Sequence, residues 1–474
     1  NIMQKILLLI ASLFYFNFLF SKNEIKSWQG IHETPLSRLE QQFAEPPVEF
    51  ANHVIWGWEG KMDKKTICND LDSIKKKGFR AVIFEAGYKL PFKYLSEEWF
   101  KAIRTGVVEA KKRDMKVWII DEGKYPSGFA GGKFSQERPD LRMQALVIGD
   151  TIQIKRGEVM TNHKIAPEII SAVAVSTSGA PNRTVEINNG KISFNAGLDD
   201  WKILLVKSDF RTAVTRAVNN PNGGKDATNS LCDYLNPVAV QQFIDWTHKQ
   251  YKKYLGKKLG TTVLGFRGDE PDYAHLPWTP SIVQTFKDTK GYDPTPYLAS
   301  FFTASPTIQE QRVKADYWDV WSSLFATHFF KLQADWCAAN GVAHITHLNK
   351  EHEMPACVKA EGDYFRALSK VQIPGVDAIW NQIWPSTLND FPKLASSVAH
   401  VYGKPRAFSE SFAAYHISPT IPQAKFVVDH QIARGINFFE FMFWLAGSKH
   451  RNWMSDPGMK GLNEYTNRTT YLMS

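Results

Sequence analysis

The chain has 474 residues, of which 43% are hydrophobic and 22% are charged, as in a folded globular protein. Its formal net charge is +9, but the basic residues lie in short runs such as 75–77 and 111–113, within segments expected to be outer helices. A nucleic-acid-binding protein concentrates such charge on one face, so we expect no nucleic-acid partner. The 15 Trp, 16 Tyr and 31 Phe suit either a packed core or a surface that stacks on sugar rings.

The N-terminus has the pattern of an export signal. Lys5 precedes an apolar run, residues 6–20, that is broken only by Ser12 and Asn17. The run is short for a membrane span and typical of a signal peptide, which we place at residues 1–21. A secreted or periplasmic protein without a stable membrane span is expected. The cysteines have no CxxC spacing and predict buried thiols rather than a disulfide framework.

From residue 52 onward, short apolar runs alternate with amphipathic stretches, which is typical of parallel β/α units. Ile67, Leu71 and Ile74 share one face of a helix over 64–77, and Asn236-Pro237 is a typical helix start. Further helices are expected at 97–113, 236–259, 309–340 and 461–474. The predicted strands are 53–58, 80–85, 116–121, 262–267, 342–347, 376–380, 406–410 and 436–443. Eight such units predict an α/β fold, a (β/α)₈ TIM barrel.

Residues 143–229 interrupt this pattern after the third strand. They contain alternating segments at 146–154, 172–175, 184–187 and 201–208, separated by turn signals such as Asn188-Asn189-Gly190. We therefore expect a β-rich insertion at 143–229 and a catalytic barrel made of 45–142 plus 230–474. The predicted helix at the end of the chain leads us to expect further C-terminal domains that this sequence lacks.

Acidic residues gather where the predicted strands end, which is where barrel enzymes place their active sites. They are Glu85, Asp121, Glu122, Asp269, Glu270 and Glu410. Crowded carboxylates raise one another's pKa values, which a fold tolerates mainly where chemistry or a cation uses them. Glycoside hydrolysis needs one protonated and one ionised carboxyl group. Glu270 and Glu410, on the fourth and seventh strands, face each other across the barrel mouth and are the expected catalytic pair.

Structural explanations exist for several of these residues. Asp269-Glu270-Pro271 also suits a helix N-terminus, where acids favour the helix dipole. The acids at 85, 121 and 122 could form salt bridges at the rim. Burying Glu410 in an apolar strand end without a function would be costly. His344 and His347 are three apart and face opposite sides of a strand, which favours separate sugar contacts over a metal pair.

Several motifs resemble those of a known family. They are the segments 56–60, 84–87, 121–128, 269–271 and 409–411. In order and spacing they are similar to the barrel of glycoside hydrolase family 106, the α-L-rhamnosidases. The resemblance implies a secreted, inverting exo-α-L-rhamnosidase acting on rhamnose-containing oligo- or polysaccharides. It also admits a bound Ca²⁺ near the sugar, although nothing in the sequence requires a cofactor.

Glu270 would then be the general acid and Glu410 the base, or the reverse, because sequence does not show which carboxyl has the raised pKa. The residues expected to bind substrate are Trp56, Trp58, Glu85, Tyr88, Asp121, Glu122, Tyr125, Asp269, His344, His347, Trp380, Asn381 and Trp444. Two alternatives remain open. One is a retaining glycosidase of other sugar specificity, with Glu410 as nucleophile. The other is a non-catalytic glycan-binding barrel, which would keep the aromatic residues but not need both acids.

Overall fold

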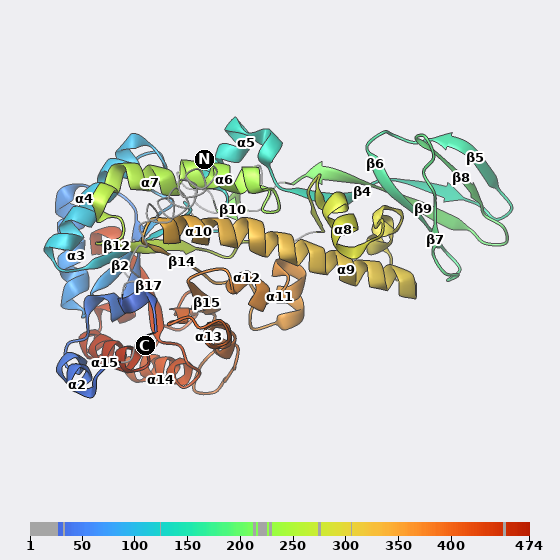
Figure 1. The fold of residues 1–474 in the computed structure, drawn as a ribbon. Helices are drawn as coiled ribbons and strands as arrows, with labels where there is room; N and C mark the ends of the chain where they lie inside the picture. Colours follow the sequence, from blue (N-terminus) through green and yellow to red (C-terminus); the bar gives the residue numbers. More distant parts are fainter. Residues whose placement is uncertain are drawn as a thin grey trace, which may run out of the picture.

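The structure is a computed structural model that describes residues 27–31, 34–123, 125–211, 215–216, 225–226, 230–273, 276–304, 306–448 and 452–474 (Figure 1). The predicted signal peptide at 1–21 lies outside the described residues. No helix among the described segments is long and apolar enough to cross a membrane.

Eight parallel strands close into a barrel in the order β1-β17-β16-β15-β14-β12-β3-β2. The strands are β1 (His53–Trp58), β2 (Ala81–Ala86), β3 (Lys116–Ile120), β12 (Val263–Gly268), β14 (Ala343–Thr346), β15 (Ile373–Ala378), β16 (Phe408–Ser411) and β17 (Phe438–Leu445). Each of the eight predicted segments overlaps one of these strands. The (β/α)₈ barrel is therefore confirmed, and it brings the carboxyl ends of all eight strands to one mouth.

Helices surround the barrel. They are α2 (Leu36–Phe43), α3 (Lys64–Lys76), α4 (Glu97–Lys112), α5 (Lys133–Glu137), α6 (Pro237–Trp246), α7 (His248–Leu255), α8 (Ile282–Lys290), α9 (Ile308–Leu324), α10 (Lys331–Ala339), α11 (Met354–Glu361), α12 (Tyr364–Leu368), α13 (Pro392–Val401), α14 (Ile421–Ile432) and α15 (Met459–Leu472). The single helix predicted over 236–259 is divided at Thr247, whose hydroxyl donates to the Phe243 carbonyl at 2.7 Å. A π-helical segment, Phe325–Phe330, joins α9 to α10.

Side chains alternate between the barrel interior and the helical layer along each strand. On β1, Ile55 belongs to the interior cluster, whereas Trp56 and Trp58 belong to the core between strands and helices. Trp56 Nε1 donates to Asp70 Oδ2 on α3 at 3.2 Å. Trp444 is also fully buried in that outer core. The prediction that these three tryptophans line a sugar pocket is wrong, because their strand positions point them away from the barrel axis.

A second sheet lies to one side of the barrel, beside α8 and the far end of α9 (Figure 1, right). Its order is β13-β4-β9-β6-β7, and β5 pairs with β8 next to it. The strands are β4 (Gln144–Ile154), β5 (Val159–Lys164), β6 (Ile169–Ser176), β7 (Arg183–Thr184), β8 (Lys191–Asn195), β9 (Trp201–Phe210) and β13 (Pro277–Trp278). The β-rich insertion after the third strand is thus confirmed as an element of the fold. Its sheet also recruits β13, which follows the fourth barrel strand, and the limits of the predicted domains stay a prediction.

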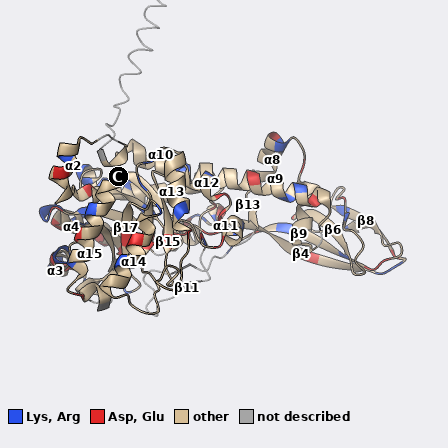
Figure 2. Cartoon of the chain, turned by 90° about the horizontal axis from the view of Figure 1, so that it is seen from below, with Lys and Arg blue, Asp and Glu red and all other residues tan. Residues whose placement is uncertain are grey.

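Charges of both signs are interspersed over the outer helices (Figure 2). Many are paired within one helix, one turn apart, as in Lys101 with Glu97 at 2.8 Å and Lys425 with Asp429 at 2.5 Å. Such pairs belong to a solvated outer face and add little stability.

Candidate active site

A cavity of about 570 Å³ opens at the carboxyl ends of the barrel strands. Seven residues expected at the site line it: Glu85, Tyr88, Tyr125, Asp269, Glu270, Trp380 and Glu410. Arg267, Asn349 and Asp377 line it as well and were not predicted. The cavity therefore combines a crowd of carboxylates with aromatic rings, and the half-exposed Trp380 stands at its rim.

Arg267 organises the base of this cavity. It points into the barrel from β12 and is fully buried. Its guanidinium forms ion pairs with Asp269 Oδ1 at 2.5 Å, with Glu440 Oε2 at 3.2 Å and with Glu410 Oε2. Because a buried guanidinium stays charged, it stabilises the ionised form of each partner. In the sequence, Arg267 could have been found as a charged residue at an inward position of a predicted barrel strand.

Glu410 points into the cavity from β16 and is 7% exposed. Besides Arg267, it has His347 Nε2 at 3.5 Å from its Oε2 atom. Arg267 and His347 thus hold the Glu410 carboxyl group in place at the cavity, where a base or a nucleophile has to be positioned.

Glu270 follows β12 and has a left-handed backbone, with φ 37°. Such a conformation is unfavourable for a residue with a side chain and occurs preferentially at functional sites. Burial, followed by the charge of Asp269, raises the pKa of Glu270 to about 8. The Glu410 charge acts in the same direction. Glu270 is therefore protonated at neutral pH.

A third carboxyl group, Asp377, lies next to this pair. It points inward from β15, and burial together with the Glu410 charge raises its pKa well above the usual range. Ligand atoms of Glu270, His347 and Asp377 lie within 4.8 Å of one another. The predicted sixth strand, 376–380, contains Asp377 but ends two residues after β15 does, so its predicted end points to Trp380 and Asn381 instead of Asp377.

His347 lies beneath the cavity rather than on its lining. Its Nε2 atom is 3.0 Å from Arg267 Nη2 and 3.4 Å from Asp269 Oδ1. Burial and the Arg267 charge oppose protonation, but hydrogen bonds with Asp269, Glu351 and Glu410 outweigh them and raise the pKa of His347. Its contacts fix the acids, so the expected direct contact with a sugar is not supported.

His344 faces the other side of β14, as its spacing from His347 predicts. It is buried against the outer helices, and burial lowers its pKa to about 3. The prediction that it binds a sugar hydroxyl is wrong, because the barrel wall separates it from the cavity.

Asp121 and Glu122 are buried beside the cavity and do not line it. Asp121 Oδ1 accepts from the Ser127 hydroxyl at 2.7 Å, and Ser127 Oγ accepts from the backbone N–H of Asp269 at 2.7 Å. Glu122 accepts backbone N–H groups at the loop residues Gly123, Ala130 and Gly131. Their predicted role as substrate ligands is corrected to that of loop anchors.

Asn381 is corrected in the same way. It is absent from the cavity lining, and its Oδ1 atom accepts the backbone N–H of His416 at 3.2 Å. This bond ties together two loops that follow neighbouring strands.

The acids do not form a complete calcium site. The two candidate groups are Asp269, His347 and Glu410, and Glu270, His347 and Asp377. Each offers two carboxylates and one imidazole, whereas Ca²⁺ takes six to eight oxygen ligands. In the first group the Arg267 guanidinium already neutralises the carboxylates.

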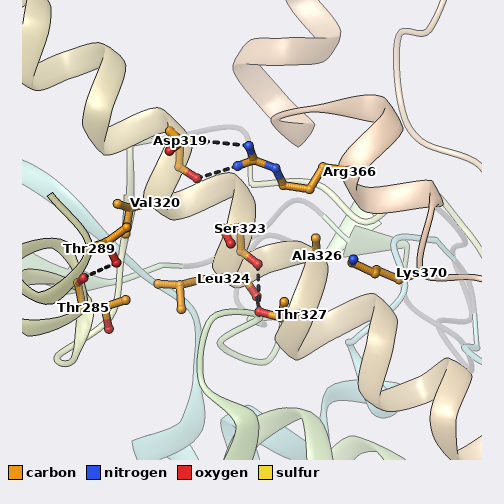
Figure 3. A pocket seen from close by; sticks show the side chains of 10 residues that line it. All are labelled: Thr285, Thr289, Asp319, Val320, Ser323, Leu324, Ala326, Thr327, Arg366 and Lys370. Atoms are coloured by element: carbon orange, nitrogen blue, oxygen red, sulfur yellow. Dashed lines mark hydrogen bonds and ion pairs between the residues drawn. The ribbon is translucent and has the colours of Figure 1, made fainter.

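A second hollow, of about 310 Å³, lies between α8, α9 and α12 (Figure 3). Among the described residues that line it, the one carboxylate, Asp319, is paired with Arg366 at 2.7 Å. Without a pair of acids, this hollow does not have the chemistry of glycoside hydrolysis.

Comparisons with known proteins agree with this geometry. A family model described as alpha-L-rhamnosidase, glycoside hydrolase family 106, matches residues 162–470, more than half of the chain. A Formosa agariphila protein named "Putative beta-glucuronidase" is 23% identical, covering 90% of this chain and 39% of that protein. The structure of a rhamnosidase from Novosphingobium sp. PP1Y superposes with a TM-score of 0.69 at 15% identity, covering 93% of this chain and 61% of that one. The chain thus spans less than two thirds of each of these two relatives, and by its family match it belongs to glycoside hydrolase family 106.

Proposed function

We propose that this chain is the catalytic barrel of an exo-acting α-L-rhamnosidase, with Glu270 as general acid and Glu410 as general base. The observation that carries the proposal is the different environment of two carboxyl groups in one cavity. The pKa of Glu270 is raised to about 8, whereas Glu410 is ion-paired with Arg267. Two acids whose environments separate their protonation states are the arrangement that glycosidases use.

The reaction needs a proton for the departing glycosidic oxygen. Glu270 is protonated at neutral pH and borders the cavity, so it can supply that proton as the bond breaks. Its left-handed backbone conformation fixes the carboxyl group at the loop between β12 and β13. Asp269 strengthens the effect, because its negative charge disfavours ionisation of its neighbour.

The reaction also needs an ionised group on the opposite face of the sugar. Glu410 is on the seventh strand of the barrel, and its carboxyl group is held by contacts with Arg267 and His347. We propose that it takes a proton from the attacking water, as the family resemblance implies for an inverting enzyme. A retaining course, with Glu410 as nucleophile, is the alternative outcome.

The cavity suits a neutral deoxy sugar better than a charged one. Six carboxylate residues line it: Glu59, Glu85, Asp269, Glu270, Asp377 and Glu410. Among the described lining residues, the one cation is Arg267, which is already bound to acids. A glucuronate would meet this negative field without a free cation, whereas the methyl group of rhamnose can pack on the apolar part of the lining, such as Ile379 and Met442.

A matched pair of substrates tests the proposal. The protein is assayed with 4-nitrophenyl α-L-rhamnopyranoside and with 4-nitrophenyl β-D-glucuronide at equal concentrations. We expect hydrolysis of the rhamnoside, and its loss in the Glu270→Gln and Glu410→Gln variants. Hydrolysis of the glucuronide alone would reject the rhamnosidase proposal. Glycan binding by a folded protein that hydrolyses neither substrate would favour a non-catalytic barrel.

We further propose that the protein is exported and acts on glycans outside the cytoplasm, because its first residues have the composition of a signal peptide. N-terminal sequencing of the protein from the culture medium or periplasm would test this. Processing near residue 21 is expected, and retention of the intact N-terminus in the cytoplasm would contradict it.

A further inference from the structure

Three metal-ligating side chains meet outside the catalytic cavity, between the barrel wall and its helices. They are His248 at the start of α7, Cys337 on α10 and His344 on the outward face of β14. Their ligand atoms lie within 4.8 Å of one another. His248 and Cys337 are 0% exposed, and His344 is 1% exposed. The fold thus brings three segments that are distant in sequence together at one buried position without solvent exposure.

The histidines of this cluster have unused ring nitrogens. Within the described part of the chain, His344 Nδ1, His344 Nε2 and His248 Nε2 have no hydrogen-bond partner. Burying a polar atom without a partner costs roughly 1–3 kcal/mol, and most buried polar groups avoid it. An ordinary core position would not be expected to hold two such rings side by side.

The other ring nitrogen of His248 is held in place. His248 Nδ1 is 2.9 Å from the Thr247 hydroxyl, at the break between α6 and α7. The ring also packs against Phe266, with centroids 4.2 Å apart. Histidines that bind metals typically use one nitrogen as ligand while the other is hydrogen-bonded. The free Nε2 atom of His248 therefore has the surroundings of a metal ligand.

We propose that His248, Cys337 and His344 bind a Zn²⁺ ion that joins α7, α10 and β14. Two imidazoles and one thiolate form a borderline-soft ligand set, which suits Zn²⁺ and not the oxygen-seeking Ca²⁺ or Mg²⁺. Binding releases the thiol proton of Cys337 to solvent, because the thiolate is the ligand. A water molecule or Gln333 Oε1 would complete the tetrahedron. Gln333 lies one turn before Cys337 and is buried, with its Oε1 atom unpartnered.

The distances are compatible with this site. In a tetrahedral zinc site the bonds are about 2.0–2.3 Å, so ligand atoms lie roughly 3.3–3.8 Å apart. The ligand atoms lie within 4.8 Å of one another here, so binding would draw them about 1 Å closer. The ion would be structural rather than catalytic, because His344 points to the helical layer while its neighbour Ile345 belongs to the barrel interior.

Zinc content of the purified protein tests the site. The protein is produced with zinc in the medium, dialysed and analysed by inductively coupled plasma mass spectrometry. We expect one Zn²⁺ per chain, and a thiolate-to-Co²⁺ charge-transfer band in the near ultraviolet after exchange with Co²⁺. The Cys337→Ala variant should lose the band and lower zinc content by at least about tenfold, since one of three ligands is gone.

The matched control is Cys357→Ala, because Cys357 is also 0% exposed but lies on α11, outside the cluster. It should keep both the zinc and the Co²⁺ band. If Cys337→Ala does not fold by circular dichroism, His344→Gln provides the same test with a side chain that retains polar groups. Absence of zinc and of a Co²⁺ band in the folded parent would overturn the proposal. Equal zinc in the parent and in a folded cluster variant would also overturn it, because the ion would then lie elsewhere.

Discussion

Arg267 and Glu410 form an ion pair inside the barrel, between a fully buried guanidinium and a carboxylate that is 7% exposed. The same guanidinium contacts Asp269 and Glu440, so one cation stabilises acids from three positions around the barrel. Glu270, which borders the same cavity, does not share this cation in the described contacts and has a raised pKa. Arg267 therefore holds Glu410 by an ion pair, whereas burial and the Asp269 charge raise the pKa of Glu270.

Replacing Arg267 by Met should damage both stability and activity. The variant leaves Asp269, Glu410 and Glu440 without their buried cation, and breaking a buried pair in this way costs about 3–5 kcal/mol. Equilibrium urea unfolding measures the loss, and kcat/KM should fall because Glu410 loses the ion pair that holds it at the cavity. The control is Arg366→Met, since the Arg366–Asp319 pair is partly exposed and such pairs contribute up to about 1 kcal/mol. Equal losses in the two variants would show that Arg267 has no special role.

Activity should decline on the alkaline side through the pKa of Glu270. Its pKa is raised to about 8, so the catalytic proton is present below that pH and lost above it. A profile of kcat/KM against pH should therefore fall above about pH 8, and the residual activity of Glu270→Gln should lack this limb. An identical alkaline limb in parent and variant would assign the titration to another group.

The same pKa shift has a consequence for stability, with a definite sign. Between the ordinary value of 4.5 and about 8, the folded state keeps a proton at Glu270 that the unfolded chain has released. The contribution of this group is therefore fully present below the unfolded value and is lost as pH rises through that window. Urea unfolding at several pH values should show a smaller loss in Glu270→Gln than in the parent.

Alanine variants of two tryptophans should distinguish a ring that stabilises the fold from a ring that binds substrate. Trp56 is 0% exposed in the outer core, whereas Trp380 is 54% exposed at the cavity rim. Trp56→Ala should cost about 3–5 kcal/mol of unfolding free energy. Trp380→Ala should leave stability within about 0.5 kcal/mol and raise KM by up to about tenfold through lost ring stacking. The interpretation fails if Trp380→Ala destabilises the fold while leaving KM unchanged.

The sequence was sufficient to locate the barrel. Strand segments such as 53–58 are apolar runs bounded by helical stretches, and β1 has the predicted limits. The sheet beside the barrel is harder to predict in full, because β13 pairs with β4 across more than a hundred residues. Strand β13 has two residues, which is too short to give a pattern in the sequence. Strand β15 contains Pro374 and Gly375, which are weak strand formers, so its start was placed too late.

The site is predicted incompletely, because a residue's place at a strand end does not show whether its side chain points into the barrel or toward the helices. Counting by twos from Ile55 on β1 assigns Trp56 and Trp58 to the helices. The same alternation on β12 puts Arg267 inside, because its neighbour Phe266 belongs to the outer core. Arg267 is neither acidic nor aromatic, so a site predicted from those residue types does not include it. The buried bonds of Glu122 could not be predicted, because they depend on the path of a loop.

The stereochemical course should be inversion. If Glu410 activates water, the first sugar released has the opposite anomeric configuration from the substrate, and no glycosyl–enzyme bond forms. Proton NMR in the first minutes of hydrolysis, before mutarotation, distinguishes the two anomers. Early accumulation of the retained anomer would keep both residues in the site but make Glu410 a nucleophile.

The roles of Glu270 and Glu410 are tested most directly by hydrolysis of two rhamnosides that differ in leaving group. A 2,4-dinitrophenyl rhamnoside departs without a proton, whereas a methyl rhamnoside needs one. Glu270→Gln should lose about 10²–10⁴-fold in kcat on the methyl rhamnoside and stay close to the parent on the dinitrophenyl substrate. Glu410→Gln should lose activity on both, because each reaction needs the base. The account is contradicted if Glu410→Gln spares the dinitrophenyl substrate while Glu270→Gln does not, or if both variants match the parent on both.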